Sequence, residues 1–72
     1  MFNQTEQRNI TVLTLSAGAC SSLARGLEIC VSMLRQQQLF VSSSLVEELR
    51  YKAIELSNTL TEAANAVWKS KE

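Results

Sequence analysis

The 72-residue chain has room for one small domain, and its composition excludes several kinds of site. It has two cysteines and neither histidine nor proline, so it offers no disulfide framework and no zinc site. Seven basic and seven acidic residues cancel, whereas a nucleic-acid-binding protein usually shows a basic excess. Between Asn9 and Val46 only Arg25, Glu28 and Arg35 are charged, so the charged residues are concentrated in the C-terminal part of the chain.

The N-terminal segment fits two interpretations. Residues 1–9 are expected to be frayed. The following sequence, "NITVLTLS", is β-branched and partly alternating, which is typical of a strand. Leu13 and Ala17 nevertheless continue the apolar spacing of the next segment, and this favours a helix from Leu13 onward.

Residues 13–38 are predicted to form the first helix of an all-α, antiparallel helical hairpin. Its contact seam repeats in steps of three and four residues and consists of Leu13, Ala17, Cys20, Ala24, Leu27, Val31 and Leu34. On one helix Cys20 and Cys30 lie about 15 Å apart, too far for a disulfide, which needs Cα atoms within about 7 Å. Two free thiols suit a reducing compartment, so a cytoplasmic location is expected.

Export and membrane insertion are not expected. The residues "AGA" before Cys20 do not form a lipoprotein box. Residues 9–24 are uncharged but rich in Ser and Thr, and this stretch is shorter than the roughly 20 apolar residues of a spanning helix.

A second helix is predicted over residues 45–70, after a break at "LFVSSS". Ser44 and Glu47 have the spacing of a capping box at its start. Its predicted seam consists of Val46, Leu49, Ala53, Leu56, Leu60, Ala63 and Val67. A short connection between two helices favours antiparallel packing, so residues 1–72 form one hairpin domain.

A second apolar repeat on the first helix indicates contact with another chain. It consists of Leu15, Ala19, Ser22, Gly26, Ile29 and Met33, and it lies largely opposite the first seam. A helix that is apolar nearly all round is usually buried, and one hairpin partner covers only one side. On the second helix, Tyr51, Ile54 and Trp68 are further candidate partner contacts, since large aromatic residues are common interface anchors.

Catalytic and cofactor-binding groups are not found. The cysteines have no histidine to act as their base, and no glycine-rich phosphate loop is present. Glu48 and Lys52 have the four-residue spacing of a helix-supporting pair. The sequence therefore predicts a protein that is not an enzyme and needs no cofactor.

The segments "LARGLEICVSMLRQQQ" and "ELRYKAIELSNTLTEAANAV", joined by a break, resemble the small YscE-like co-chaperones of type III secretion needles. The resemblance covers about residues 23–67 and rests on length and apolar pattern. It implies a bacterial cytoplasmic hairpin that stabilises a larger helical chaperone, the pair then shielding the needle subunit. The uncharged, β-branched start departs from that pattern.

Two alternatives remain open. In a ribbon-helix-helix DNA-binding repressor, "RNITVLTLS" would be the strand that enters the major groove. In a homo-oligomeric regulator or inhibitor of the phage type, the second apolar repeat would bind another copy or block a target protein. The neutral charge and the length of the first helix argue against the DNA-binding alternative.

Overall fold

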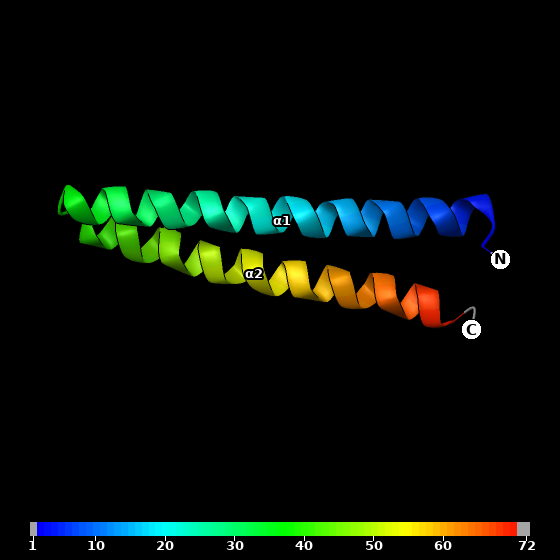
Figure 1. Cartoon of the computed structure of the whole chain (residues 1–72). Helices are drawn as coiled ribbons and strands as arrows, with labels where there is room; N and C mark the ends of the chain where they lie inside the picture. The colour runs from blue at the N-terminus through cyan, green and yellow to red at the C-terminus, as the bar shows by residue number, and fades with distance from the viewer. Residues whose placement is uncertain (1, 71–72) are drawn as a thin grey trace.

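The computed structural model describes residues 2–70, which form a two-helix hairpin (Figure 1). Helix α1 spans Gln4–Gln36 and helix α2 spans Phe40–Lys69. The helices run antiparallel and form a rod with extents of 54 × 14 × 12 Å. The described residues contain no strand, so the expected all-α helical hairpin is confirmed.

Helix α1 begins nine residues earlier than predicted. The Oδ1 atom of Asn3 accepts a hydrogen bond from the backbone N–H of Glu6 at 2.8 Å and thereby caps the first turn. The prediction of fraying is therefore wrong for residues 4–9, while Met1 lies outside the described residues. The strand interpretation of residues 9–16 is also wrong, because Ile10 and Leu13 continue the contact side of the helix.

The turn between the helices is shorter than predicted and lies at residues 37–39. The backbone N–H of Leu39 donates to the carbonyl of Leu34 at 2.9 Å, and that of Gln38 donates to Arg35 at 3.0 Å. These two bonds form a Schellman motif, with Gln38 in the left-handed region at φ 62°. Helix α2 then begins at Phe40 with no side-chain cap, so the capping box expected at Ser44 is wrong.

Replacing Gln38 by glycine is expected to stabilise the hairpin by about 1 kcal/mol, because glycine adopts a positive φ without the steric cost that a Cβ imposes. Chemical denaturation followed by circular dichroism would measure the change. Gln37→Gly is the matched control, since Gln37 has an ordinary φ of −91° and glycine there should lower stability. Equal effects of the two substitutions would contradict this account of the turn.

The contact side of α1 is the one predicted from its spacing. Ala17, Ala24 and Val31 are buried. The other four predicted seam residues, Leu13, Cys20, Leu27 and Leu34, are half-buried. The seven-residue repeat of α1 therefore faces α2 along the length of the hairpin, as expected of coiled-coil packing.

The contact side of α2 is rotated relative to the prediction. Leu49 and Leu56 are about half exposed, at 54% and 49%. Their places toward α1 are taken by Ser43, Arg50, Ser57 and Ala64, which repeat every seven residues and are buried or half-buried. The predicted seam is thus wrong at Leu49 and Leu56, and the real one contains small and polar residues.

Hydrogen bonds between the helices explain this rotation. The Ser57 hydroxyl donates to the backbone carbonyl of Ala17 at 3.0 Å and lies 2.8 Å from the Ser21 hydroxyl. Nearer the turn, Nε of Arg35 donates to the Ser43 hydroxyl at 3.2 Å. The serines that face α1 are therefore buried together with hydrogen-bond partners, and no buried side-chain polar atom among the described residues lacks one.

The core between the helices is built from small side chains. Its buried apolar residues are Ala17, Ala24, Val31, Ala53 and Ala64. Fourteen large apolar residues among those described are instead exposed. A small domain depends on burying apolar area, so a hairpin that leaves most leucines outside has little stability of its own.

Candidate protein-interaction surface

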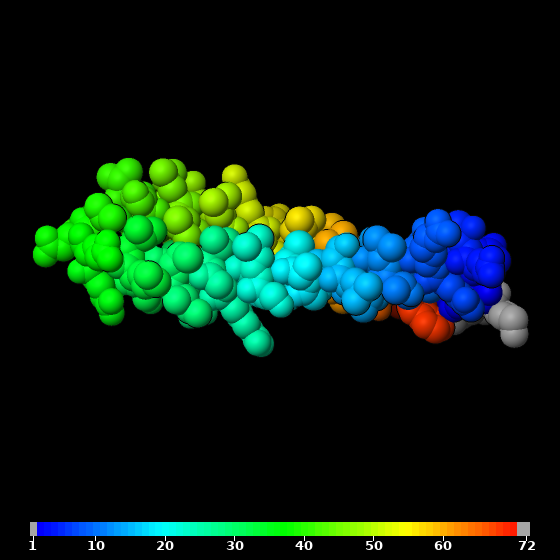
Figure 2. All heavy atoms as spheres, turned by 90° about the horizontal axis from the view of Figure 1, so that it is seen from above, coloured from blue at the N-terminus to red at the C-terminus, as the bar shows by residue number. Residues whose placement is uncertain are grey.

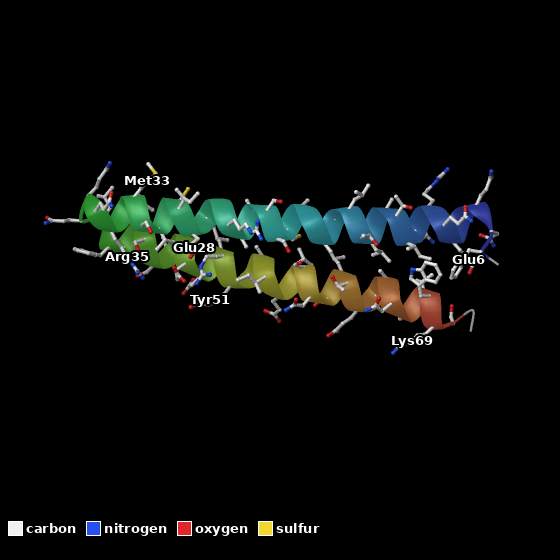
Figure 3. The ribbon with its side chains drawn as sticks, in the orientation of Figure 1. Glu6, Glu28, Met33, Arg35, Tyr51 and Lys69 are labelled. Carbon is white, nitrogen blue, oxygen red and sulfur yellow. The ribbon has the colours of Figure 1, made fainter. Side chains whose placement is uncertain are left out.

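The second apolar repeat lies on the side of α1 that points away from α2. We call Leu15, Ala19, Ser22, Gly26, Ile29 and Met33 the outer stripe, and all six are exposed. Leu15 is 68% and Ile29 63% exposed. Seen from above, α1 lies in front along its whole length and no other described element covers it (Figure 2). Met33 points away from α2 (Figure 3).

Glycine in the outer stripe is not required by the hairpin itself. A Cβ atom added at Gly26 would meet no heavy atom within 4 Å, and the same holds for Gly18. Glycine in a helix interior costs about 1 kcal/mol relative to alanine. Because Gly26 has no steric role within the chain, a larger residue there is a clean probe of contacts with another molecule.

The three candidate residues on α2 do not join the outer stripe. Ile54 and Trp68 line grooves between the helices, together with polar groups of α1. Tyr51 is 60% exposed, and the guanidinium of Arg50 lies 4.7 Å from the centre of its ring. Sequence reasoning placed all nine candidates at partner contacts, and the structure divides them between two separate surfaces.

Trp68 closes the end of the hairpin where both termini lie. Its ring packs edge-to-face against Phe2, with ring centres 4.7 Å apart. This contact joins the residues before α1 to the last turn of α2. Trp68 therefore has a structural role within the chain, although half of its surface is exposed.

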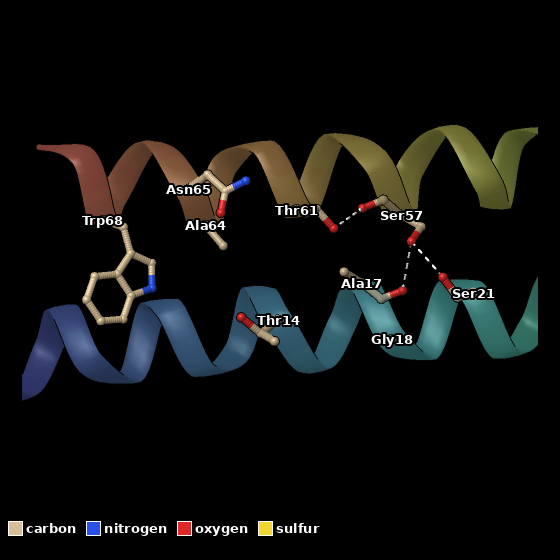
Figure 4. A pocket seen from close by; sticks show the side chains of 9 residues that line it. All are labelled: Thr14, Ala17, Gly18, Ser21, Ser57, Thr61, Ala64, Asn65 and Trp68. Carbon is tan, nitrogen blue, oxygen red and sulfur yellow. Dashed lines mark hydrogen bonds between the residues drawn. The ribbon is translucent and has the colours of Figure 1, made fainter.

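A polar groove of about 380 Å³ runs between the helices beside Trp68 (Figure 4). Hydroxyl groups from both helices line it, including those of Thr14, Ser21, Ser57 and Thr61. Thr61 donates to the Ser57 backbone carbonyl at 2.9 Å, and Ser57 bonds to Ala17 and Ser21 of α1, so these hydroxyls are hydrogen-bonded within the chain. The groove thus combines these hydroxyl groups with the apolar groups of Ala17, Ala64 and Trp68.

Charged groups continue this polar side toward the turn. Arg50 forms an ion pair with Glu47, its Nε lying 3.0 Å from Oε1. The hydrogen bond from Arg50 lowers the pKa of Glu47 below its ordinary value. A second groove, lined by Arg25, Glu28 and Arg50 among others, lies on the same side.

The opposite side of the hairpin is apolar, and sequence reasoning missed it. We call its exposed residues the apolar face; they are Val12, Leu23 and Cys30 of α1 and Leu45, Leu49 and Leu56 of α2. Helical spacing places each set on the side of its helix away from Ser21 and Ser57. The signal in the sequence was the pair Leu49 and Leu56, which the prediction assigned to the core.

The described residues hold no cluster of metal-binding side chains. No group of three or more His, Cys, Asp or Glu residues with the geometry of a metal site occurs within residues 2–70. Cys20 and Cys30 are free thiols, with Cys20 half-buried and Cys30 exposed.

By length and composition, α1 is a helix that could cross a membrane. Its 33 residues remove the objection of length raised from the uncharged stretch at residues 9–24. Core helices and signal sequences meet the same description, and α1 contacts α2 through its buried alanines. The outer stripe and the apolar face both remain exposed beside this contact.

Comparison with known proteins adds no relative to this description. No family model, curated protein or solved structure matches the chain.

Proposed function

We propose that the protein is a non-enzymatic adaptor or co-chaperone, which stabilises a partner protein by packing the outer stripe of α1 against it. The observation that supports the proposal is the exposure of large apolar side chains on this stripe. Leu15, Ile29 and Met33 are each more than half exposed. Apolar surface of this extent marks an interaction site on a soluble protein.

The sequence of the outer stripe favours a helical partner. Ala19, Ser22 and Gly26 are small residues between larger ones, so a second helix can approach the backbone of α1 closely. Leu15, Ile29 and Met33 would pack beside that helix as anchors. This arrangement matches helix-in-groove recognition, in which anchors recur at helical spacing.

The resemblance to YscE-like co-chaperones suggests which kind of partner to expect. In that family a larger helical chaperone is stabilised by the small hairpin, and the pair protects a needle subunit in the bacterial cytoplasm. We propose the same class of partner and compartment for this chain. Two observations test this proposal: the identity of the captured protein, and the subcellular fraction from which it is recovered.

The DNA-binding alternative loses its structural premise. A ribbon-helix-helix protein needs a strand at residues 8–16, and these residues lie within α1. The charged residues of the described chain also form no basic stripe on either helix. The strand that would have entered the major groove is absent from this part of the molecule.

Affinity purification of the full chain from its native host, followed by identification of what co-purifies, tests the proposal. Wild type and Glu62→Ala should both capture one helical partner from the soluble fraction. Ile29→Asp and Gly26→Leu should lose it, because one places a charge and the other a bulky side chain on the outer stripe. Glu62 is exposed and lies outside the stripe.

The unfolding temperatures of the purified variants separate lost contact from lost folding. Ile29 is exposed and Gly26 has open space around it, so both variants should melt no lower than wild type. Equal capture by all four proteins would refute the role of the outer stripe. Recovery of the chain only from the membrane fraction, without a protein partner, would replace the proposal with a membrane-spanning α1.

A further inference from the structure

We propose that the apolar face packs against the same face of a second copy, forming a four-helix bundle from two hairpins. This surface borders the outer stripe along α1, where Val12 lies seven residues before Ala19. It also includes leucines of α2 that the outer stripe does not contain, so the inference goes beyond the proposed function. It rests on the difference between the two broad sides of the hairpin, on the size of the apolar side, and on charge.

The two broad sides have opposite character. One carries the hydroxyl and charged grooves, lined by Ser21, Ser57, Arg25 and Glu28 among others. The other carries grooves lined mainly by apolar groups, one of them from Cys30, Met33, Leu34 and Val46 with Gln37. A second such groove, near the termini, is lined by Val12, Leu13 and Val67 with Asn9. One side therefore presents hydroxyl and charged groups to the solvent, whereas the other exposes apolar groups that a second molecule can bury.

The apolar face has the dimensions of a stable dimer interface. The side of the hairpin that carries the apolar face is 54 Å long and 14 Å wide, its polar positions included. A second copy lying along this side covers a footprint of roughly 750 Å², close to the ~800 Å² that each partner buries in a standard interface. A second copy has the same length, so it covers the face from end to end. Two-fold pairing of identical surfaces is also the commonest closed form of oligomer.

Burial in the dimer would complete a core that the single hairpin lacks. The fully buried residues of the seam between α1 and α2 are alanine, serine and one valine, whereas Leu23, Leu49 and Leu56 are exposed. Stacking two hairpins places Leu23, Leu49 and Leu56 of each copy in the centre of a bundle. Four-helix bundles are filled by such side chains, contributed by facing helices.

Electrostatics allow this self-association. Seven basic and seven acidic residues leave the chain without net charge, so two copies do not repel each other. All six residues of the apolar face are uncharged, and the exposed Lys52 lies beside Leu49 and Leu56 at its edge. The charged groups Arg25, Glu28, Arg50 and Glu47 line the polar side and stay in water when the apolar faces meet.

Sedimentation equilibrium of the purified full chain tests the inference. Wild type should sediment at twice the 8.0 kDa chain mass. Leu56→Glu should raise the dissociation constant at least about 30-fold, because it places a charge in the centre of the interface. Leu15→Glu is the control, because it makes the same substitution at an exposed leucine of the outer stripe, and it should leave the dimer intact.

Thermal unfolding at several protein concentrations gives a second measurement, which holds even if Leu56→Glu unfolds. The wild-type midpoint should rise with concentration, because dimer formation stabilises the folded state by mass action. A monomer with a concentration-independent midpoint would overturn the inference. So would a dimer that Leu15→Glu disrupts as strongly as Leu56→Glu, since the outer stripe would then be the interface between copies. Leu56 lies on α2, outside the outer stripe, so Leu56→Glu should keep partner capture while it disrupts the dimer, and the two proposals fail separately.

Discussion

Ala17→Asp is expected to unfold the isolated hairpin. Ala17 is only 6% exposed and its carbonyl accepts a hydrogen bond from Ser57, so the new carboxylate would enter the buried contact between the helices. No charged residue occurs between Asn9 and Ala24 to neutralise it from α1. An unpaired buried charge costs about 3–5 kcal/mol, which equals the whole stability that a single small core usually supplies.

Circular dichroism at low temperature would detect this loss of helix directly. Ala19→Asp is the matched control, because Ala19 lies two residues away on the exposed side of the same helix. The control should keep its helical signal and melt within a few degrees of wild type. Similar melting of both variants would mean that α1 does not face α2 through Ala17.

Ala53→Leu is expected to force the helices apart, at a cost of about 1–3 kcal/mol. Ala53 is 8% exposed on the contact side of α2, where small residues set the distance between the helices. Alanine and leucine have similar helix propensities, so the change in unfolding free energy reports packing and not helix formation.

Urea denaturation of Ala53→Leu and Ala66→Leu would isolate this packing effect. Ala66 is an exposed alanine on the same helix, and leucine there should change stability by less than about 0.5 kcal/mol. A stabilised Ala53→Leu variant would show that the seam has room for larger side chains. The small-residue core would then not define the hairpin.

The contact side of α1 was predictable from the sequence because its seam is apolar at every step. Positions such as Ala24, Leu27 and Val31 follow one seven-residue repeat, and no competing polar group lies within it. The hairpin itself followed from the absence of proline and from two long periodic segments. These features depend on local spacing, which the sequence displays directly.

The contact side of α2 was not predictable in the same way. Two seven-residue repeats lie side by side there, one through Leu49 and Leu56 and the other through Arg50 and Ser57. Hydrophobicity alone selects the leucines. In the hairpin the serine repeat faces α1, where the Ser57 hydroxyl bonds to Ala17 and Ser21. The spacing of apolar residues in the sequence does not reveal such hydrogen-bond partners on the other helix.

Helix ends were the least predictable feature. Asn3 is a strong N-cap residue, but the β-branched residues that follow it favoured a strand interpretation. At the turn, a glutamine occupies the left-handed position where glycine would have been the recognisable signal. Of the candidate site, the exposure of the outer stripe followed from helical geometry, while the apolar face depended on the rotation of α2.

The hydrogen bonds of Ser57 to α1 are expected to determine which part of the hairpin unfolds first. These bonds lie in the middle of the hairpin, and the groove between that point and Trp68 is only partly filled. Amide hydrogens near Ala17 and Ser57 should therefore exchange with deuterium more slowly than those near Thr5 and Ala66. Local unfolding of the hairpin would then begin at the termini and proceed inward, while the contact at Ser57 stays formed.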